Sequence, residues 1–524
     1  MPIFEHFLFL RVDELTGKPQ PIHMYSPGAE KKLPPVTLDF LYPDLKSFEN
    51  RRILGSEHYA FVMTRKGGIK QYGYCMRRMQ AGAGAKYPEV ICILSKHPFH
   101  CFFKAVLECI QVRWLIDKGF ALSLLRTLAG VTGKQVHQNV LQLRIDGPKF
   151  QETMMFPVDH PIDYPFMRDY FCLLMKIVSP DDLLLIFNAM LLEKRIVVVA
   201  ESLTKLSNVV HALVGLLYPL RWQHIFLPIL PLKHIHYTCA PMPFFVGMHR
   251  DNVPVLEQQP LSEVVLVDLD ARNDAPTLSL MGGESDSIPS ILPIELTAKL
   301  RKRLKWGEAR TSPRFIQSCF TAFFAVLFHP CDWSWAGVTG KFDERALALV
   351  QSESPDLFPC LKAMTHSQMF EVFADGEIKR VKDKVSGMPK PGALQTFDLL
   401  VQLCKENPTS FKLALKTITN IHAKRYKAND RLLPPLPKAN DLLGKLAHAT
   451  VSNTKSITQK ARSKFSKLAK KWTKKKGKKL EEDHMMSSPE ESVADLDSPG
   501  RVSAINQARA ALGFDAKLVG GGAH

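Results

Sequence analysis

The sequence predicts an α/β protein with more than one folded domain and a charged C-terminal tail. Residues 195–200 form an unbroken run of mostly β-branched apolar residues, which is typical of a strand buried on both faces in a parallel sheet. A helical pattern follows, and its apolar residues share one face: Leu203, Leu206, Val210, Leu213 and Leu217. The length of 524 residues allows about three domains.

Residues 1–116 alternate strand patterns with turns and end in a helix. Strands are predicted over 4–12, 59–64, 72–78 and 90–94, and the second and third of these flank a hairpin turn at Lys66-Gly67-Gly68. An amphipathic helix is predicted over 102–115. These residues therefore form a small α/β unit.

The rest of the chain divides by composition. A connecting segment over 117–165 contains a helix at 120–128 and two edge-like strands, and a central α/β module covers 166–290. Within that module, Ser179 and Pro180 open a helix, 264–269 is a final strand and 270–290 is a polar loop. Residues 291–385 are mostly helical with breaks at Pro330 and Pro355, 386–430 form a helical extension, and 431–524 form a tail.

Several short words in one order carry a family resemblance. They are Leu192-Glu193-Lys194-Arg195, Leu217-Tyr218-Pro219, Trp222-Gln223-His224, Pro228-Ile229-Leu230-Pro231, Ala240-Pro241-Met242-Pro243 and Gly247. Further matching words flank them: Tyr72-Gly73-Tyr74-Cys75, the run from Pro88 to Ser95, and Ser367-Gln368-Met369-Phe370. In these words the chain resembles the DENN-domain family over roughly residues 1–385.

The resemblance implies a two-lobed fold. Residues 1–116 would be an upstream module with a longin-like fold, and the central module with the helical downstream module would form an α/β C-lobe. It also implies guanine nucleotide exchange on a Rab-type small GTPase held between the lobes, an activity that needs no general acid, base or nucleophile. Two alternatives are a non-catalytic trafficking scaffold and a GTPase-activating protein, for which Arg221 or Arg250 would supply the arginine.

The GTPase-binding residues are expected around the helix that follows residue 202. Its polar side chains are expected to face outward, and the aromatic and amide groups after it are candidate contacts for the switch segments. The candidates are Ser202, Thr204, Lys205, Asn208, Tyr218, Trp222, Gln223 and His224. Two interpretations stay open: Tyr218, Pro219, Trp222 and Pro241 also suit a core role, and Glu193, Lys194 and Arg195 also suit a local charge network.

Patterns for other chemistry are missing from the sequence. Gly133-Lys134 and Gly340-Lys341 lack the residues that a phosphate-binding loop requires before and after them. His97, His100 and Cys101, like His234 and His236, lack a spaced second pair, and no HExxH or GxSxG motif occurs. No cofactor, metal or nucleic acid is expected.

The net charge of +18 is concentrated in the tail. Eleven lysines and Arg462 lie between Lys455 and Lys479 without an acid. Apolar residues recur there at helical spacing, which favours an amphipathic helix on an anionic membrane, although a solvated tail or a nuclear-import patch at 474–479 stays open. The predicted membrane contacts are Ile457, Phe465, Lys467, Leu468, Lys471, Trp472 and Lys475.

Two more features of the tail suggest partners. Arg431, Pro434 and Pro437 fit a basic residue followed by PxxP, which indicates an SH3 ligand or a rigid linker. Phosphorylation of Ser488 or Ser498 in the acidic stretch would weaken the hold of the basic helix on a membrane. Ten scattered cysteines and no eighteen-residue apolar run lead us to expect a cytoplasmic protein, peripheral on endosomal, vesicle or plasma membrane.

Overall fold

The structure is a computed structural model. It describes residues 2–27, 33–34, 36–45, 48, 55–65, 67–79, 85–132, 140–147, 150–157, 168–270, 277–282, 288–305, 313–385, 392–407 and 411–430. The predicted membrane and SH3 contacts of the tail lie outside the described residues, so they stay predictions.

A first sheet of five antiparallel strands has the order β2-β1-β5-β4-β3. Its strands are β1 (His6–Val12), β2 (Pro19–Tyr25), β3 (Ser56–Thr64), β4 (Lys70–Met79) and β5 (Pro88–Ser95). Every residue of β5 is buried, because both faces of the sheet are covered. The four strands predicted in this region are confirmed, and β2 is added at one edge.

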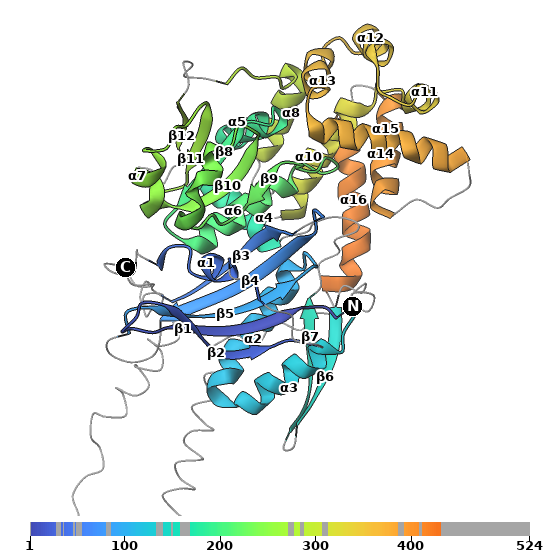
Figure 1. Ribbon diagram of the computed structural model, residues 1–524. Helices are drawn as coiled ribbons and strands as arrows, with labels where there is room; N and C mark the ends of the chain where they lie inside the picture. Colours follow the sequence, from blue (N-terminus) through green and yellow to red (C-terminus); the bar gives the residue numbers. More distant parts are fainter. Residues whose placement is uncertain are drawn as a thin grey trace, which may run out of the picture. The chain divides into compact units, whose positions relative to one another are not determined.

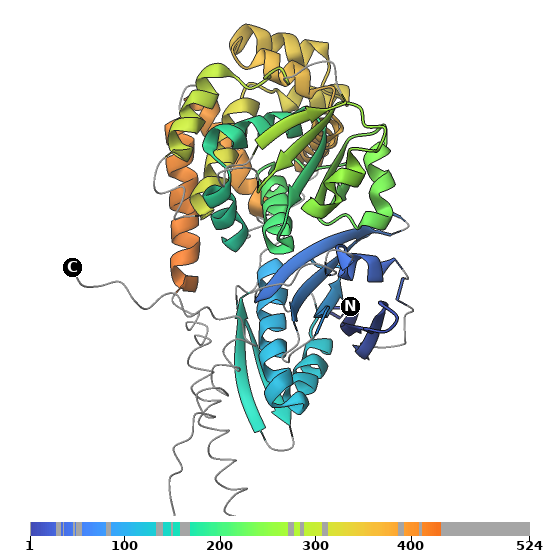
Figure 2. The same cartoon turned by 90° about the vertical axis from the view of Figure 1, so that its left-hand side faces the viewer.

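The first sheet is covered by helices on its two faces. The short helix α1 (Thr37–Leu41) lies on one face, and α2 (His100–Ile116) lies on the other (Figure 1). The helix α3 (Lys118–Ala129) begins where Asp117 accepts a hydrogen bond from the Phe120 amide at 3.2 Å. The hairpin of β6 (Val140–Gly147) and β7 (Phe150–Pro157) runs beside α2 and α3 (Figure 2). The helices and the two strands predicted here are confirmed.

A second sheet has the order β12-β11-β8-β10-β9. Its strands are β8 (Arg195–Ala200), β9 (Ile225–Leu227), β10 (Phe244–His249), β11 (Val264–Asp268) and β12 (Thr277–Met281). β8 pairs in parallel with β10 and β11, which confirms the predicted buried parallel strand. The prediction that 270–290 is a loop after a final strand is wrong for 277–281, because β12 pairs antiparallel with β11 through residues of alternating polarity.

Helices and short turns connect the strands of the second sheet. They are α4 (Arg168–Ile177), α5 (Pro180–Leu191), α6 (Leu203–Gly215), η3 (Leu232–Cys239), η4 (Arg250–Asn252) and α7 (Val253–Leu256). Ser179 caps α5 by accepting a hydrogen bond from the Asp182 amide at 3.1 Å, as its sequence predicts. α6 ends at Gly215, so Leu217 is buried just beyond the helix rather than on it.

Gly247 permits the close crossing of two segments at the centre of this sheet. The Leu230 amide donates to the Gly247 carbonyl at 2.7 Å, so the chain after β9 lies directly against β10. A Cβ atom at Gly247 would lie 2.2 Å from the Pro228 carbonyl oxygen. Since backbone fills that space, only glycine fits this position of the family word.

The downstream part consists of helices over the described residues. They are α8 (Ile294–Leu304), α10 (Pro313–Phe328), α11 (Trp333–Thr339), α12 (Glu344–Glu353), α13 (Phe358–Met364), α14 (Gln368–Val385), α15 (Gly392–Glu406) and α16 (Phe411–Asp430). α10 is almost fully buried, with α15 and α16 packed against it (Figure 1). The predicted helical content and the breaks at Pro330 and Pro355 are confirmed.

None of the described helices is by itself long and apolar enough to span a membrane, and only α10 and α11 together reach that length and hydropathy, as a pair bent by 62°. The α/β class with downstream helices is confirmed, whereas the longin-like character of the first sheet stays a prediction.

Candidate functional site

The first and second sheets meet where α6 covers the outer edge of β3. An edge strand exposes a row of unpaired backbone groups, and side chains of α6 satisfy them here. Thr204 Oγ1 accepts from the His58 amide at 2.9 Å, and Ser207 Oγ accepts from the Ala60 amide at 2.9 Å and donates to the Ala60 carbonyl at 3.0 Å. We call this contact the joint. The joint therefore uses α6, the helix whose polar side chains were expected from the sequence to contact a GTPase.

A cluster of aromatic side chains continues the joint beyond these hydrogen bonds. The rings of His100, on α2, and His211, on α6, lie edge to face with centroids 4.7 Å apart, and Tyr170 contacts both. Burial lowers the pKa of His211 to about 4. Burial also lowers the pKa of His100, and the nearby His211 adds to this effect. Both imidazoles are therefore neutral at pH 7.

A cavity of about 50 Å³, with polar and apolar side chains in its lining, lies in the joint. Its lining includes His58, His100, Lys104, Tyr170 and Asn208, which come from both sides of the joint. A space of this size suits ordered water better than a ligand. The joint is therefore an internal contact rather than a binding pocket.

The four candidate residues at the start of α6 are taken up by internal contacts. Ser202 caps the helix by accepting from the Lys205 amide, the Lys205 ammonium pairs with Asp270, and Thr204 binds β3. Asn208 is buried. The expectation that these side chains face outward is wrong for Asn208, which is buried, and for Thr204, which bonds to the edge of β3. Ser202 and Lys205 are half-buried, so for them it stays a prediction.

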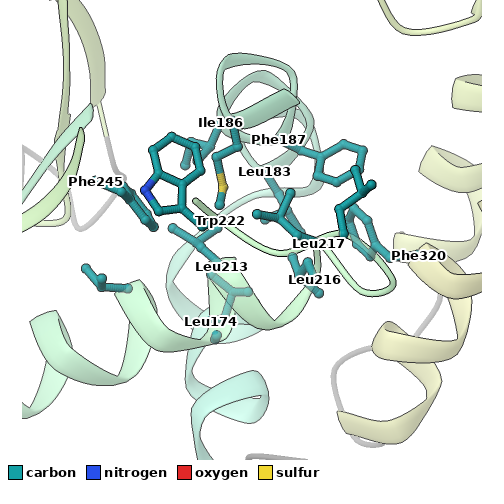
Figure 3. Packing of buried hydrophobic residues seen from close by; sticks show 14 of the residues in the cluster. Leu174, Leu183, Ile186, Phe187, Leu213, Leu216, Leu217, Trp222, Phe245 and Phe320 are labelled. Carbon is teal, nitrogen blue, oxygen red and sulfur yellow. The ribbon is translucent and has the colours of Figure 1, made fainter. Parts of the chain in front are cut away.

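The candidates after α6 fall into three environments. Trp222 is only 4% exposed, donates its indole N–H to the Ile225 carbonyl at 3.1 Å and packs among apolar residues of the core (Figure 3). Tyr218 is half-buried, with its ring centroid 6.3 Å from that of Phe397. Gln223 is exposed, and its amide donates to the Arg221 carbonyl at 2.8 Å. The core interpretation therefore holds for Trp222, and Gln223 keeps its side chain available.

Glu193 links the second sheet to the downstream helices. Its carboxylate accepts hydrogen bonds from the amides of Gln368, at 3.0 Å, and Met369, at 2.8 Å, which are the first residues of α14. His224 Nε2 lies 2.8 Å from the same carboxylate. An acidic side chain at a helix N-terminus accepts hydrogen bonds from free N–H groups and interacts favourably with the positive end of the helix dipole. Three of the family words therefore meet at Glu193, which favours the charge-network interpretation for this residue.

The carboxyl ends of the parallel strands carry a second set of ion pairs. Arg250 binds Asp268 at 2.6 Å and the carbonyl of Asp270, so this candidate for an activating arginine is held in place. His249 donates to the Glu201 carbonyl at 2.7 Å, and its Nε2 lies 3.8 Å from Asp44 on the other side of the joint.

Asp44 belongs to a buried network inside the first sheet. It holds Arg77 through two hydrogen bonds of 2.6 and 2.9 Å, and Glu57 accepts a further one at 2.8 Å. Burial opposes the charge of Arg77, but the two carboxylates outweigh it and raise its pKa above the ordinary value. The network fixes β4 against the turn after α1.

One exposed surface combines residues from both sides of the joint. Asp39, on α1, pairs with Lys233 at 2.6 Å and with His234 at 3.1 Å, so α1 lies beside η3. Exposed apolar side chains lie on these two segments or next to them in the chain: Val36 (37% exposed) directly precedes α1, Tyr237 (41%) belongs to η3 and Met242 (52%) follows η3. We call this surface the α1–η3 face. Sequence reasoning missed it, although Met242 belongs to a family word.

The described residues contain no group of three or more His, Cys, Asp or Glu side chains placed to hold a metal ion. Three of the described ion pairs, Lys205–Asp270, His224–Glu193 and Arg250–Asp268, lie at the start of α6, at the N-terminus of α14 and at the strand ends.

Comparison with known proteins finds a DENN domain match in part of the chain. Residues 86–272, from the turn before β5 to the segment after β11, match the DENN (AEX-3) domain. The chain is also similar to DENN domain-containing protein 2A of Mus musculus, with 31% identity over 265 residues, which is 50% of this chain and 26% of that protein. It is similar as well to DENN domain-containing protein 2B of Mus musculus, with 31% identity over 281 residues, which is 53% of this chain and 24% of that protein.

A shorter relative is covered more completely. DENN domain-containing protein 2D of Homo sapiens is 27% identical over 355 residues, which is 66% of this chain and 73% of that protein. The chain spans about a quarter of the 2A and 2B proteins. Part of the chain, residues 86–272, thus matches the DENN domain, and the chain is similar to DENN domain-containing proteins over stretches longer than that part.

Proposed function

We propose that this chain is a guanine nucleotide exchange factor that promotes GDP release from a Rab-type small GTPase in membrane trafficking. The observation that carries the proposal is the DENN match, which spans β5 to β11 and therefore includes α6 of the joint together with β5 and α2 of the first sheet's part. The family resemblance implies the activity, and the α1–η3 face offers a surface to which both sheets contribute.

The mechanism follows from linkage and needs no bond-making step. An exchange factor that binds the nucleotide-free GTPase more tightly than the GDP-bound form must weaken GDP binding by the same factor. The free energy comes from contacts that form only when the switch segments have left the nucleotide. A rigid arrangement of the two sheets serves this purpose, because a flexible one would follow the GTPase instead of deforming it.

The α1–η3 face is the docking surface that the described residues support best. Tyr237 and Met242 are the kind of exposed aromatic and methionine side chains that are enriched at protein interfaces. Of the candidates predicted from sequence, Gln223 is a direct contact in this proposal, and Thr204 and Asn208 act by holding the joint.

The test is release of fluorescent GDP from a panel of Rab GTPases with the full chain. We expect accelerated release from at least one member. We also expect a loss on the order of 10- to 100-fold in kcat/KM for Y237A/M242A, since the two truncations together should cost about 1.4–2.8 kcal/mol. V338A is the matched control, because Val338 is 82% exposed on α11 and lies outside this face. Faster GTP hydrolysis without faster GDP release would indicate a GTPase-activating protein. Binding to the GTPase without either effect would indicate a non-catalytic scaffold.

Recruitment to membranes is part of the same proposal. The lysine-rich stretch between Lys455 and Lys479 supports binding to anionic vesicle, endosomal or plasma membranes, and Arg431, Pro434 and Pro437 support an SH3 partner. The full chain with F465E/W472E is expected to lose sedimentation with phosphatidylserine vesicles while keeping exchange in solution. Unchanged sedimentation would refute this part.

A further inference from the structure

Basic side chains gather at one end of the first sheet. Here β3 ends, β4 begins and β5 ends, because the antiparallel register pairs Thr64 of β3 with Lys70 of β4, and Ser95 of β5 with Tyr72, two residues further along β4. Arg65, Lys70 and Lys96 follow or begin these strands. One acid lies among them: Glu5 is 3.7 Å from Arg65 and 3.5 Å from Lys96.

A fourth cation reaches this end of the sheet from across the joint. β3 and α6 run in the same direction, since His58 binds Thr204 and Ala60 binds Ser207. The end of β3 therefore approaches the chain that follows α6, where Arg221 is exposed. We call Arg65, Lys70, Lys96 and Arg221 the cationic rim.

Lys70 and Arg221 lie close enough for their like charges to interact. Atoms packed around the ammonium group lower the pKa of Lys70, although much of its side chain is exposed, and the charge of Arg221 lowers it further. Neither side chain forms an ion pair with a carboxylate of the described residues. Holding two like charges together without an acid costs free energy, and a partner that supplies carboxylates would recover it.

The surroundings of the rim favour a protein partner. Ile69, at the tip of the β3–β4 hairpin, is 49% exposed and adds an apolar contact beside the charges. Gln223, the exposed candidate contact, donates to the backbone carbonyl of Arg221. The rim therefore adjoins one residue already proposed to meet the GTPase, and it has the mixture of charged and apolar groups that is typical of an interface rim.

We propose that the cationic rim selects the GTPase partner by binding an acidic patch on its surface. This inference rests on the proposed exchange function. Rim charges act mainly on the rate of association and on partner choice, because oppositely charged surfaces attract before they touch and like-charged surfaces repel. GTPases without acidic residues at the facing position would be poor substrates even when their switch segments fit.

The experiment compares the full chain with its K70E/R221E variant in GDP release over the Rab panel, at about 50 and 200 mM salt. We expect the variant to lose on the order of tenfold in kcat/KM at the lower salt, and its rate to become insensitive to salt or to rise with it. The control K299E/K302E makes the same change in charge on the exposed face of α8 and is expected to behave as wild type. Substituting the acids of the responding GTPase by lysine should restore exchange with K70E/R221E.

Each outcome bears on the inference. Equal loss in K70E/R221E and the control would assign the effect to net charge alone and overturn the proposal. Unchanged exchange by K70E/R221E would also overturn it while leaving the exchange function intact. A variant that exchanges normally but no longer sediments with phosphatidylserine vesicles would assign the rim to lipid. If the wild-type chain accelerates release from no GTPase, the exchange function and this inference both fail.

Discussion

Removing the hydroxyl group of Ser207 from the joint should lower the stability of the protein substantially. Ser207→Ala removes the hydroxyl that both accepts from the Ala60 amide and donates to the Ala60 carbonyl. Both residues are buried, so the two backbone groups of Ala60 would lose their partners without gaining water.

The magnitude follows from counting these groups. Each hydrogen bond contributes about 1 kcal/mol net, and a buried polar group left without a partner costs about 1–3 kcal/mol. With two such groups, the N–H and the carbonyl of Ala60, Ser207→Ala should lower the free energy of unfolding by about 2–6 kcal/mol.

Urea unfolding followed by circular dichroism measures this change through the transition midpoint. Ser352→Ala is the matched control, because its hydroxyl donates one bond of 2.9 Å, to the Leu349 carbonyl, on the exposed side of α12. The control should stay within about 0.5 kcal/mol of wild type. A Ser207→Ala variant as stable as the control would refute the role assigned to the joint.

Further predictions concern α14, the close backbone crossing and pH. Glu193→Ala removes the carboxylate that caps α14 and should lower the free energy of unfolding, measured by thermal denaturation, by about 1–3 kcal/mol. An unchanged stability would show that Glu193 is not the cap on which α14 depends. Gly247→Ala should fail to fold or unfold several degrees lower, whereas Gly376→Ala, in open space on α14, should be neutral or more stable by up to about 1 kcal/mol. The pKa of His211 is about 4 in the folded protein and near 6.5 in the unfolded chain. The neutral imidazole should therefore contribute about 3 kcal/mol to the free energy of unfolding above pH 6.5, and this contribution should be lost as the pH falls towards 4. A free energy of unfolding that does not change over this range would contradict the buried, neutral His100 and His211.

Sequence patterns predicted the elements that carry a clear local signal, such as a continuous apolar run or a helix-start motif. The strand β8 is apolar throughout because both its faces are covered, and α5 carries its own start signal in Ser179 and Pro180. β12 was missed although Leu278 and Leu280 alternate with polar residues, because the strand is short and lies between Asp-, Asn- and Gly-rich segments.

The candidate site was harder to predict, because its polar residues have partners far away in the chain. Thr204 and Asn208 were expected to face outward, since polar residues on one side of a helix usually meet water. Here that side meets the edge of β3, about 150 residues earlier, which no local pattern reports. Conversely, Tyr237 and Met242 are exposed although such residues are more often buried, and only the neighbouring α1 shows why they form a surface.

The central claim is that the two sheets together bind a vacant GTPase more strongly than a GDP-loaded one. Surface plasmon resonance with the responding Rab, either stripped of nucleotide or saturated with GDP, measures this directly. We predict that the two affinities differ by the same factor by which the chain weakens GDP binding. Equal affinity for both forms would contradict the account.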